Sequence, residues 1–483
     1  MKQRIVLLIS LVGIGVSLPA QSFEERFRSF RQEAQNNYAS FRDKANQQYA
    51  DFMRAAWEYY KAAPAVPIPQ EEPIPPVIYN EEQQEKEEQV VIEDVVTPPT
   101  PQPQPQPLPV EPVQPISPVQ PNTCQFKYFN TPCTVRIPKQ LMQLEMASND
   151  AFSQGWEVLS NGEYDVTLSD CLQLRTQLSL CDWAYLLMLY EFSTAIYKAP
   201  TNEAILLCAW LYTQSGYQMR LAQDKEQLHL LFASSHAIYG QPYFQLDGYN
   251  YYSLLSASDS IQICTAAFEN EQTLSLYLPD YPHLQANLSS TRTLQSSEFK
   301  DMFVTVQTNR NLIEFYNTYP SSEIHNNPLT RWAMYANTPL STEVEQNIYP
   351  LLYQKIQGLT YRIAVEKLLN FVQTAFVYEY DDKVWGDDRA FFAEETLFYP
   401  YADCEDRSIL FSRLVRDLLG LPVVLVYYPG HLATAVAFPE PEQGDYILID
   451  GTRFTICDPT YIGAPVGATM PNMNNQAAKA ILL

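Results

Sequence analysis

Residues 403–428, which read DCEDRSILFSRLVRDLLGLPVVLVYY, decide the fold of the C-terminal part of this chain. Apolar residues recur there at helical spacing until Gly420 ends the helix: Ile409, Leu410, Leu414, Val415 and Leu418. The run LPVVLVYY that follows predicts a strand. Cys404 is therefore expected in the first turn of the helix. There the unpaired N–H groups and the positive end of the helix dipole favour a thiolate over a thiol.

More strands are predicted beyond this unit, from GHLATAVAF, YILI and RFTIC, with a hairpin turn at Asp450 and Gly451. His431 begins the second strand and is the only histidine that follows Cys404. Asp458 ends the fourth strand. A cysteine on a helix, a histidine on a strand and a later aspartate are the residue types of a nucleophile, a base and a group that orients the base.

The motifs DCEDRS, GHLATAV and CDPTY resemble the transglutaminase-like superfamily, the papain-related group that includes bacterial transglutaminase-like cysteine proteases. The resemblance implies an α+β fold in which the helix that carries the cysteine packs on an antiparallel sheet. It also implies that Cys404 attacks an amide carbonyl, that His431 transfers the proton and that Asp458 holds the imidazole. Gln373 is a candidate side-chain donor to the oxyanion, beside the Cys404 N–H. No cofactor and no metal are expected in this site.

The cysteines allow a different interpretation. The chain has eight of them, and in an oxidising compartment Cys404 could be half of a disulfide. Two other pairs are close enough in sequence to bond instead, Cys124 with Cys133 and Cys171 with Cys181. A disulfide at Cys404 would leave the histidine and aspartate motifs unexplained, so the nucleophile is the preferred interpretation.

The polar residues of the predicted site have simpler interpretations too. His431 could be a core histidine, and Asp458 could cap a turn or a helix. Before the cysteine, the chain passes through an acidic loop, residues 381–395, whose carboxylates could bind calcium. We favour a solvated loop over the cleft, because runs of charge are usually exposed to water.

The middle of the chain repeats the organisation of the C-terminal part. The stretches AILLCAWLYTQSGYQMRLA and SILFSRLVRDLLGLPVVLV each read as a helix, a glycine and a strand, and YFQLDG likewise matches YILIDG. We therefore predict two copies of one fold, a degenerate domain over residues 122–300 and a catalytic domain over residues 301–483. In the first copy Pro200 takes the cysteine position, and the histidine position is near Gln227. Chance likeness of two helix-strand units is the alternative.

The N-terminus is expected to direct the protein out of the cytoplasm. Lys2 and Arg4 precede an apolar run and small residues that end at Ala20, which is typical of a secretory signal peptide over residues 1–20. No later stretch is predicted to span a membrane. The mature protein is therefore expected to be periplasmic or secreted.

Two further segments are expected between the signal peptide and the globular part. Residues 21–62 have an 11-residue repeat, which predicts a nearly straight helix. The repeat consists of three series: Phe30, Phe41 and Phe52; Ala34, Ala45 and Ala56; Tyr38, Tyr49 and Tyr60. Such a helix must either self-associate or dock on its own protein. Residues 63–121 are rich in proline, glutamate and glutamine and are expected to be a disordered, extended linker.

The charge and the motifs together narrow the function. A net charge of −24 argues against binding to the phosphates of nucleic acids. The predicted function is an exported thiol-dependent amide hydrolase or acyltransferase that acts on proteins or peptides, cell-wall peptides being one class. The alternative is a non-catalytic binding protein or envelope scaffold with the same fold. The predicted helix of residues 21–62 adds self-association as a possible interaction.

Overall fold

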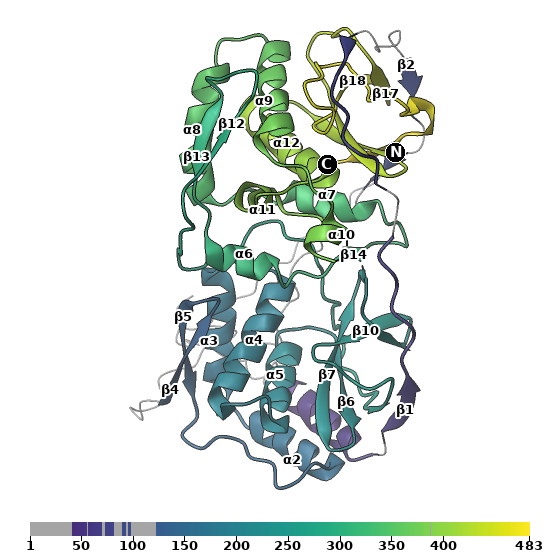
Figure 1. The fold of residues 1–483 in the computed structure, drawn as a ribbon. Helices are drawn as coiled ribbons and strands as arrows, with labels where there is room; N and C mark the ends of the chain where they lie inside the picture. Colours follow the sequence, from purple (N-terminus) through teal and green to yellow (C-terminus); the bar gives the residue numbers. More distant parts are fainter. Residues whose placement is uncertain are drawn as a thin grey trace, which may run out of the picture.

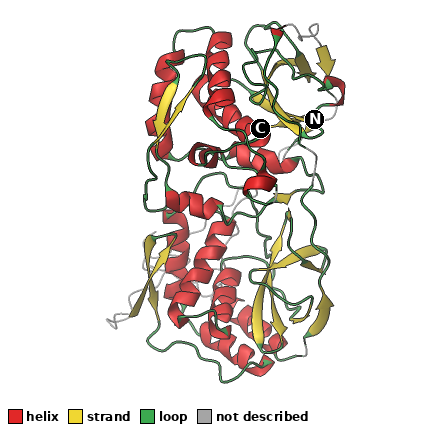
Figure 2. Ribbon diagram, viewed as in Figure 1, coloured by secondary structure: helices red, strands yellow, loops and turns green. Residues whose placement is uncertain are grey.

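The computed structural model describes residues 41–55, 57–69, 73–81, 89–92, 95–97, 122–386 and 388–483. They form a mixed α+β protein, as predicted, with most helices on one side and two curled sheets on the other (Figure 1, Figure 2). The predicted signal peptide and residues 21–40 of the predicted helix lie outside these ranges. Among the described helices, none is both long enough and apolar enough to cross a membrane.

The N-terminal half of the molecule packs helices against one curled sheet (Figure 1, lower half). Its helices are α2 (Asn149–Leu159), α3 (Asp165–Gln177), α4 (Asp182–Tyr197) and α5 (Asn202–Gln214). Its strands, in the spatial order β1-β11-β6-β7-β10-β9, are β1 (Glu58–Lys61), β11 (Ser260–Ile263), β6 (Met219–Asp224), β7 (Gln227–Ser234), β10 (Tyr249–Ser253) and β9 (Tyr243–Leu246). A hairpin lies beside α3 and α4 and is formed by β4 (Asn122–Tyr128) and β5 (Thr131–Ile137).

The C-terminal half has the same plan (Figure 1, upper half). Its helices are α6 (Arg310–Tyr316), α7 (Thr330–Asn337), α8 (Thr342–Ile356), α9 (Tyr361–Ala375), α10 (Asp381–Val384), α11 (Ala393–Phe398) and α12 (Cys404–Leu419). Its strands, in the order β2-β17-β18-β16-β15-β19-β3, are β2 (Gln89–Val91), β17 (Tyr446–Ile449), β18 (Thr452–Cys457), β16 (His431–Val436), β15 (Val423–Tyr428), β19 (Lys479–Leu482) and β3 (Val95–Val96). Two short pairs complete the set: β8 (Ala237–Ile238) with β14 (Ser322–Glu323), and β12 (Arg292–Gln295) with β13 (Phe303–Val306).

The two sheets share a strand order. In the N-terminal half the order β11-β6-β7-β10-β9 is antiparallel at every step. In the C-terminal half the strands lie in the order β19-β15-β16-β18-β17. In both of these sets the last strand along the chain lies beside the first, and this second set is also antiparallel at every step. Each set follows a helix and a glycine, α5 with Gly216 and α12 with Gly420. The predicted match of helix, glycine, strand and hairpin order between the halves is therefore confirmed.

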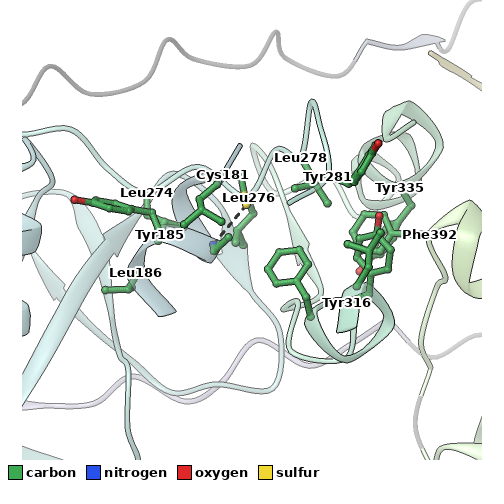
Figure 3. Close-up of a cluster of buried hydrophobic side chains, with 14 of the residues drawn as sticks. Cys181, Tyr185, Leu186, Leu274, Leu276, Leu278, Tyr281, Tyr316, Tyr335 and Phe392 are labelled. Carbon is green, nitrogen blue, oxygen red and sulfur yellow. Dashed lines mark hydrogen bonds between the residues drawn. The ribbon is translucent and has the colours of Figure 1, made fainter. Parts of the chain in front are cut away.

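A continuous apolar core joins the halves. Leu274, Leu276 and Leu278 belong to it, and all three are buried. Figure 3 shows these leucines between residues of α4 and a group of aromatic rings. Within that group the Tyr316 and Phe392 rings stack at 4.3 Å between centroids. Because the halves share one buried cluster, they are packed as one body and not joined by a linker alone.

The N-terminal helix docks on the protein, which is one of the two predicted alternatives. Residues 41–53 are helical, and Asn46, Tyr49, Ala50 and Met53 face the N-terminal half and are buried. Tyr49 packs against Trp156 with ring centroids 4.5 Å apart. Self-association through residues 21–62 stays a prediction.

The buried face of this helix differs from the predicted stripe. Phe41 and Phe52 of the 11-residue repeat are 47% and 65% exposed. The predicted helix also ends too late, because residues 58–61 form β1 and pair with β11. Without β1, strand β11 would lie at the edge of the sheet and would have unpaired backbone groups. Residues 58–61 can bond to these groups only in an extended conformation, which favours strand β1 over a longer helix.

The prediction of a disordered linker over residues 63–121 is wrong for the parts that the structure describes. Strand β2 pairs in parallel with β17, and β3 pairs in parallel with β19, so the two strands form the edges of the C-terminal sheet. Both strands contain valine, whose β-branched side chain favours an extended backbone on a half-buried sheet. Residues 98–121 lie outside the described ranges.

All eight cysteines are free thiols. Cys124 and Cys133 lie on adjacent strands, but they pair with Val135 and Phe126 and not with each other. Cys181 caps helix α4, where its sulfur accepts the Ala184 N–H at 3.5 Å. The disulfides considered from the sequence are therefore not formed in this structure.

Candidate active site

Cys404 is the first residue of helix α12, and the carboxylates of two aspartates cap the start of this helix. The Asp403 side chain accepts the Asp406 N–H at 3.4 Å, and the Asp406 side chain accepts the Asp403 N–H at 3.3 Å. The buried Arg407 guanidinium ties the same turn to the preceding segments by donating to three backbone carbonyls, those of Gln373, Phe376 and Ala402. These bonds fix Cys404, which is 5% exposed.

His431 and Asp458 lie on neighbouring strands and are hydrogen bonded. His431 begins β16, and Asp458 directly follows β18, which pairs with β16. The imidazole Nε2 lies 2.9 Å from Asp458 Oδ2, and both side chains are buried. In the neutral imidazole whose Nε2–H donates to this carboxylate, Nδ1 has a lone pair that can accept a proton. Nδ1 is buried and has no hydrogen-bond partner among the described residues.

The loop that carries Asp458 is held in place by Gln373 of helix α9. Asp458 Oδ1 accepts the Thr460 N–H at 2.8 Å. Gln373 Nε2 donates to the backbone oxygens of Asp458 and Ala464 at 3.0 and 3.1 Å, and its Oε1 accepts the Gly463 N–H at 3.1 Å. Both amide hydrogens are therefore used inside this loop. The structure places Gln373 as a support of the loop, and leaves it no spare hydrogen for the oxyanion role predicted from the sequence.

Cys404 and His431 line one cavity of about 300 Å³. Its walls come from α12, from the turn before β16, from α7 and from the segment around α10. Five of the lining residues are acidic: Asp381, Asp382, Asp388, Asp403 and Glu405. Arg331 is the basic residue of the lining, and its guanidinium lies 3.4 Å from Asp388. Acidic side chains therefore outnumber basic ones in the cavity lining.

The pKa of the Cys404 thiol is raised well above its ordinary value. Burial is the main cause, and the nearby carboxylates of Glu405 and Asp403 add to it. The Leu432 N–H acts in the opposite direction. The thiol donates to Glu405 Oε2 at 3.3 Å. The expectation of a thiolate favoured by the helix dipole is therefore wrong for this structure, because burial, together with the acids of the first turn, outweighs the dipole.

The acidic segment of residues 381–395 is largely folded. Helix α10 forms its start and the first residues of α11 form its end, and Glu394 and Glu395 are buried. The expectation of a solvated loop is therefore wrong for these two residues. Oxygen atoms of Asp381, Asp388 and Glu405 lie within 4.8 Å of one another, and burial raises the pKa of Asp381 to about 7. Calcium binding by this group stays untested, and Asp387 lies outside the described residues.

The N-terminal half has a different residue at the position of the cysteine. Helix α5 begins at Asn202 after the cap residue Thr201, as α12 begins at Cys404 after its cap residue. Asn202 Oδ1 accepts the Leu228 N–H at 2.8 Å. The start of α5 thus matches Asn202 with Cys404, whereas Gly216 and Gly420 after the helices match in the predicted register, in which Pro200 takes the cysteine position. Gln227 begins β7 as the histidine begins β16, so the predicted histidine position is confirmed.

Two features of the site were missed in the sequence. Glu405 stands directly after the cysteine in the motif DCEDRS, where a charged residue on the buried side of a helix was a usable signal. Pro69 and Pro73 also line the cavity, although the sequence assigns them to a linker. No local pattern could have placed them, since their position depends on contacts far along the chain.

Comparison with known proteins gives no relative on which to base an assignment. No family model, no curated protein and no solved structure matches this chain.

Proposed function

We propose that this protein is a thiol-dependent enzyme that cleaves or transfers amide groups of proteins or peptides. The observation that carries the proposal is the hydrogen bond of 2.9 Å between His431 and Asp458, because His431 lines the same cavity as Cys404. This arrangement leaves the second imidazole nitrogen free to take a proton. A nucleophile, a base and an orienting carboxylate are the parts that acyl transfer needs.

The proposed reaction has two steps. Cys404 Sγ attacks the amide carbon while the proton of the thiol passes to His431 Nδ1. The imidazolium then gives this proton to the leaving nitrogen, the carbon–nitrogen bond breaks, and a thioester remains on the enzyme. In the second step water or an amine attacks the thioester and gives a proton to Nδ1. The carbon–sulfur bond breaks, and the proton returns to the sulfur. The N–H of Cys404, at the start of α12, is the proposed donor to the oxyanion.

The raised pKa of Cys404 decides how the first step is initiated. A thiol that is protonated at rest cannot act as a preformed ion pair with the imidazole. Proton removal therefore accompanies the attack, and Asp458 contributes by stabilising the imidazolium that forms. Asp458 is itself fixed by the Thr460 N–H, so the base is held in one orientation.

The fold agrees with this proposal at a coarser level. The helix that carries Cys404 packs on the antiparallel strands β15 and β16, as expected for a papain-like or transglutaminase-like core. We interpret the shared strand order of the two halves as a duplication in which the N-terminal copy is degenerate. In that copy the corresponding helix begins at Asn202 and the corresponding strand at Gln227, so neither element begins with a thiol or an imidazole. Export of the mature chain is part of the same proposal.

Formation of the acyl-enzyme tests the proposal directly. We expect a peptide p-nitrophenyl ester to acylate the intact protein, with release of nitrophenol and a mass increase located at Cys404. Cys404→Ala should abolish the adduct, and His431→Ala should slow it by a factor of about 100 or more. Cys457→Ala is the matched control, because Cys457 is a buried thiol of β18 that lies away from the cavity lining. An adduct that survives Cys404→Ala would refute the proposal.

A second candidate function is a non-catalytic binding protein. The observation that favours it is the excess of carboxylates around Cys404, which disfavours the charged form of the nucleophile. The two functions differ in the acylation experiment, because a binding protein would retain peptide without forming a thioester.

A further inference from the structure

A proline-rich part of the chain crosses from one half of the molecule to the other over the candidate site. We call residues 63–69 and 73–79 the strap. At its start Ala63 N donates to Tyr243 O at 2.7 Å, and Gly240 N donates to Val66 O at 2.9 Å. Figure 1 shows this purple segment running from β1 beside the lower sheet to the upper sheet. The strap is therefore attached to the edge of the first sheet before it reaches the cavity.

The strap contributes to the cavity and then binds the segments that hold the histidine and the aspartate. Pro69 and Pro73 belong to the cavity lining. Ile74 N donates at 3.0 Å to the oxygen of Gly430, the residue before the histidine. Farther on, Tyr79 N donates to Ile462 O at 2.9 Å, and Ile462 N donates to Val77 O at 2.9 Å. Ile462 lies in the loop that follows the aspartate.

The hydrogen bonds of the strap suit a proline-rich chain. The two N–H groups that bind to this surface come from Ile74 and Tyr79. Pro73, Pro75 and Pro76 stand before and between them and have no N–H to leave unpaired. Proline also favours the extended polyproline II conformation, which presents its backbone to a partner at little cost in entropy. The surface thus accepts an extended chain in which proline is tolerated at several positions.

Side chains of the strap add an apolar contact. Ile74, Val77 and Tyr79 pack against an apolar group on the loop after β18: Tyr461, Ala464, Ala468 and Met470. The rings of Tyr79 and Tyr461 meet edge to face at 5.4 Å between centroids. Ile78 points away and is 77% exposed. Three side chains of the strap therefore contact this surface while Ile78 faces away from it, as in the recognition of an extended peptide by pockets for selected side chains.

We propose that this surface is a binding groove for an extended, proline-containing peptide, and that the strap occupies it from within the chain. The external ligand is a peptide with an aliphatic residue, two prolines, a second aliphatic residue and an aromatic residue at the spacing of the strap. The strap is partly exposed along its length, so a peptide can exchange with it. The inference rests on the proposed function in one respect, namely that the peptide would be the substrate presented to Cys404.

The test measures binding of a fluorescent peptide with the sequence of residues 73–81 to the full chain carrying Cys404→Ser. An attached segment competes at high effective concentration, so the protein with an intact strap should bind the free peptide weakly. The double substitution Ile74→Asp and Tyr79→Ala should weaken the strap and increase the affinity for the peptide at least tenfold. Ile78→Asp is the matched control, and it should behave as the intact strap does.

The outcomes separate this inference from the proposed function. Equal affinity in the strap variant and in the control, with circular dichroism and melting temperature showing that both are folded, would overturn the groove. If the double variant does not fold, Tyr79→Ala alone is compared in the same way, because it removes the ring and leaves every backbone hydrogen bond. Peptide binding without formation of an acyl-enzyme in the wild-type protein would support the proposed groove and contradict the proposed enzymatic function.

Discussion

At the scale of single residues, Glu405 has the largest described effect on the reactivity of the site. Its carboxylate accepts a hydrogen bond from the Cys404 thiol, and after burial it is the strongest cause of the raised pKa of that thiol. A negative charge this close opposes the formation of a second one. The residue therefore keeps the nucleophile protonated until a base removes the proton.

Replacing this carboxylate should make the thiol more acidic. We expect Glu405→Gln to shift the pH profile of Cys404 alkylation by iodoacetamide to lower pH, by about one to three units, because the thiolate is the reactive form. Asp382→Asn, at an exposed acid of the same cavity, should leave the profile nearly unchanged. Reaction of the other thiols is measured with Cys404→Ser and subtracted. A profile that does not move in Glu405→Gln would show that burial alone raises the pKa.

The sequence predicted the three central residues better than their surroundings. Cys404, His431 and Asp458 could be found because helix and strand periodicity places each of them at the end of an element, and sheet pairing then brings two of them together. Gln373 was found but given the wrong partner, since its bonds depend on the path of a loop. Side-chain direction within a loop leaves no periodic signal.

At the scale of elements, the N-terminal helix is held by a polar network as well as by apolar contacts. Asn46 Oδ1 accepts the Trp156 Nε1–H at 3.0 Å and a Gln214 Nε2–H at 2.9 Å, and all three residues are buried. An 11-residue repeat cannot reveal that a polar residue faces the interior. For this reason the sequence predicted the presence of a helix but not which face docks.

Removal of this network should loosen the docked helix. We expect Asn46→Ala to lower the free energy of unfolding by about 1–3 kcal/mol, because it leaves buried donors on Trp156 and Gln214 without an acceptor. Gln48→Ala, at an exposed position of the same helix, should change it by less than about 0.5 kcal/mol. Urea denaturation monitored by tryptophan fluorescence measures both values. A loss in Asn46→Ala no larger than in the control would mean that apolar contacts alone dock the helix.

At the scale of the whole molecule, the sequence predicted the shared order of elements in the two halves but not the ordered parts of the linker. Helices such as α2 and α9 bury one face and show a periodic pattern, whereas α5 and β16 are buried almost throughout and read as mostly apolar runs. Strands β2 and β3 are short, and their partners β17 and β19 lie hundreds of residues away along the chain. Composition therefore suggests disorder in this region, whereas the open sheet edges supply the partners that order it.

The packing of the two halves also sets a pH dependence for the stability of the molecule. Glu394 of α11 is buried beside the shared core, and its oxygens accept the Ser341 N–H at 2.8 Å and the Ser341 hydroxyl at 3.0 Å. Burial raises its pKa from the ordinary 4.5 to about 7. Between these values the folded state keeps a proton that the unfolded state has lost. The contribution to stability is thus complete below pH 4.5 and is lost as the pH rises to about 7.

Glu394→Gln should reduce this pH dependence, because glutamine resembles the protonated carboxyl group at every pH. One proton accounts for at most about 1.4 kcal/mol per pH unit, so the slope of unfolding free energy between pH 5 and pH 7 should become less negative by up to about that amount. The Ser341 hydroxyl can accept from the new amide, which limits the cost of the substitution itself. Glu343→Gln, at an exposed acid nearby, should keep the wild-type slope. If both variants keep that slope, the proton taken up on folding resides elsewhere, and Glu394 is charged inside the core.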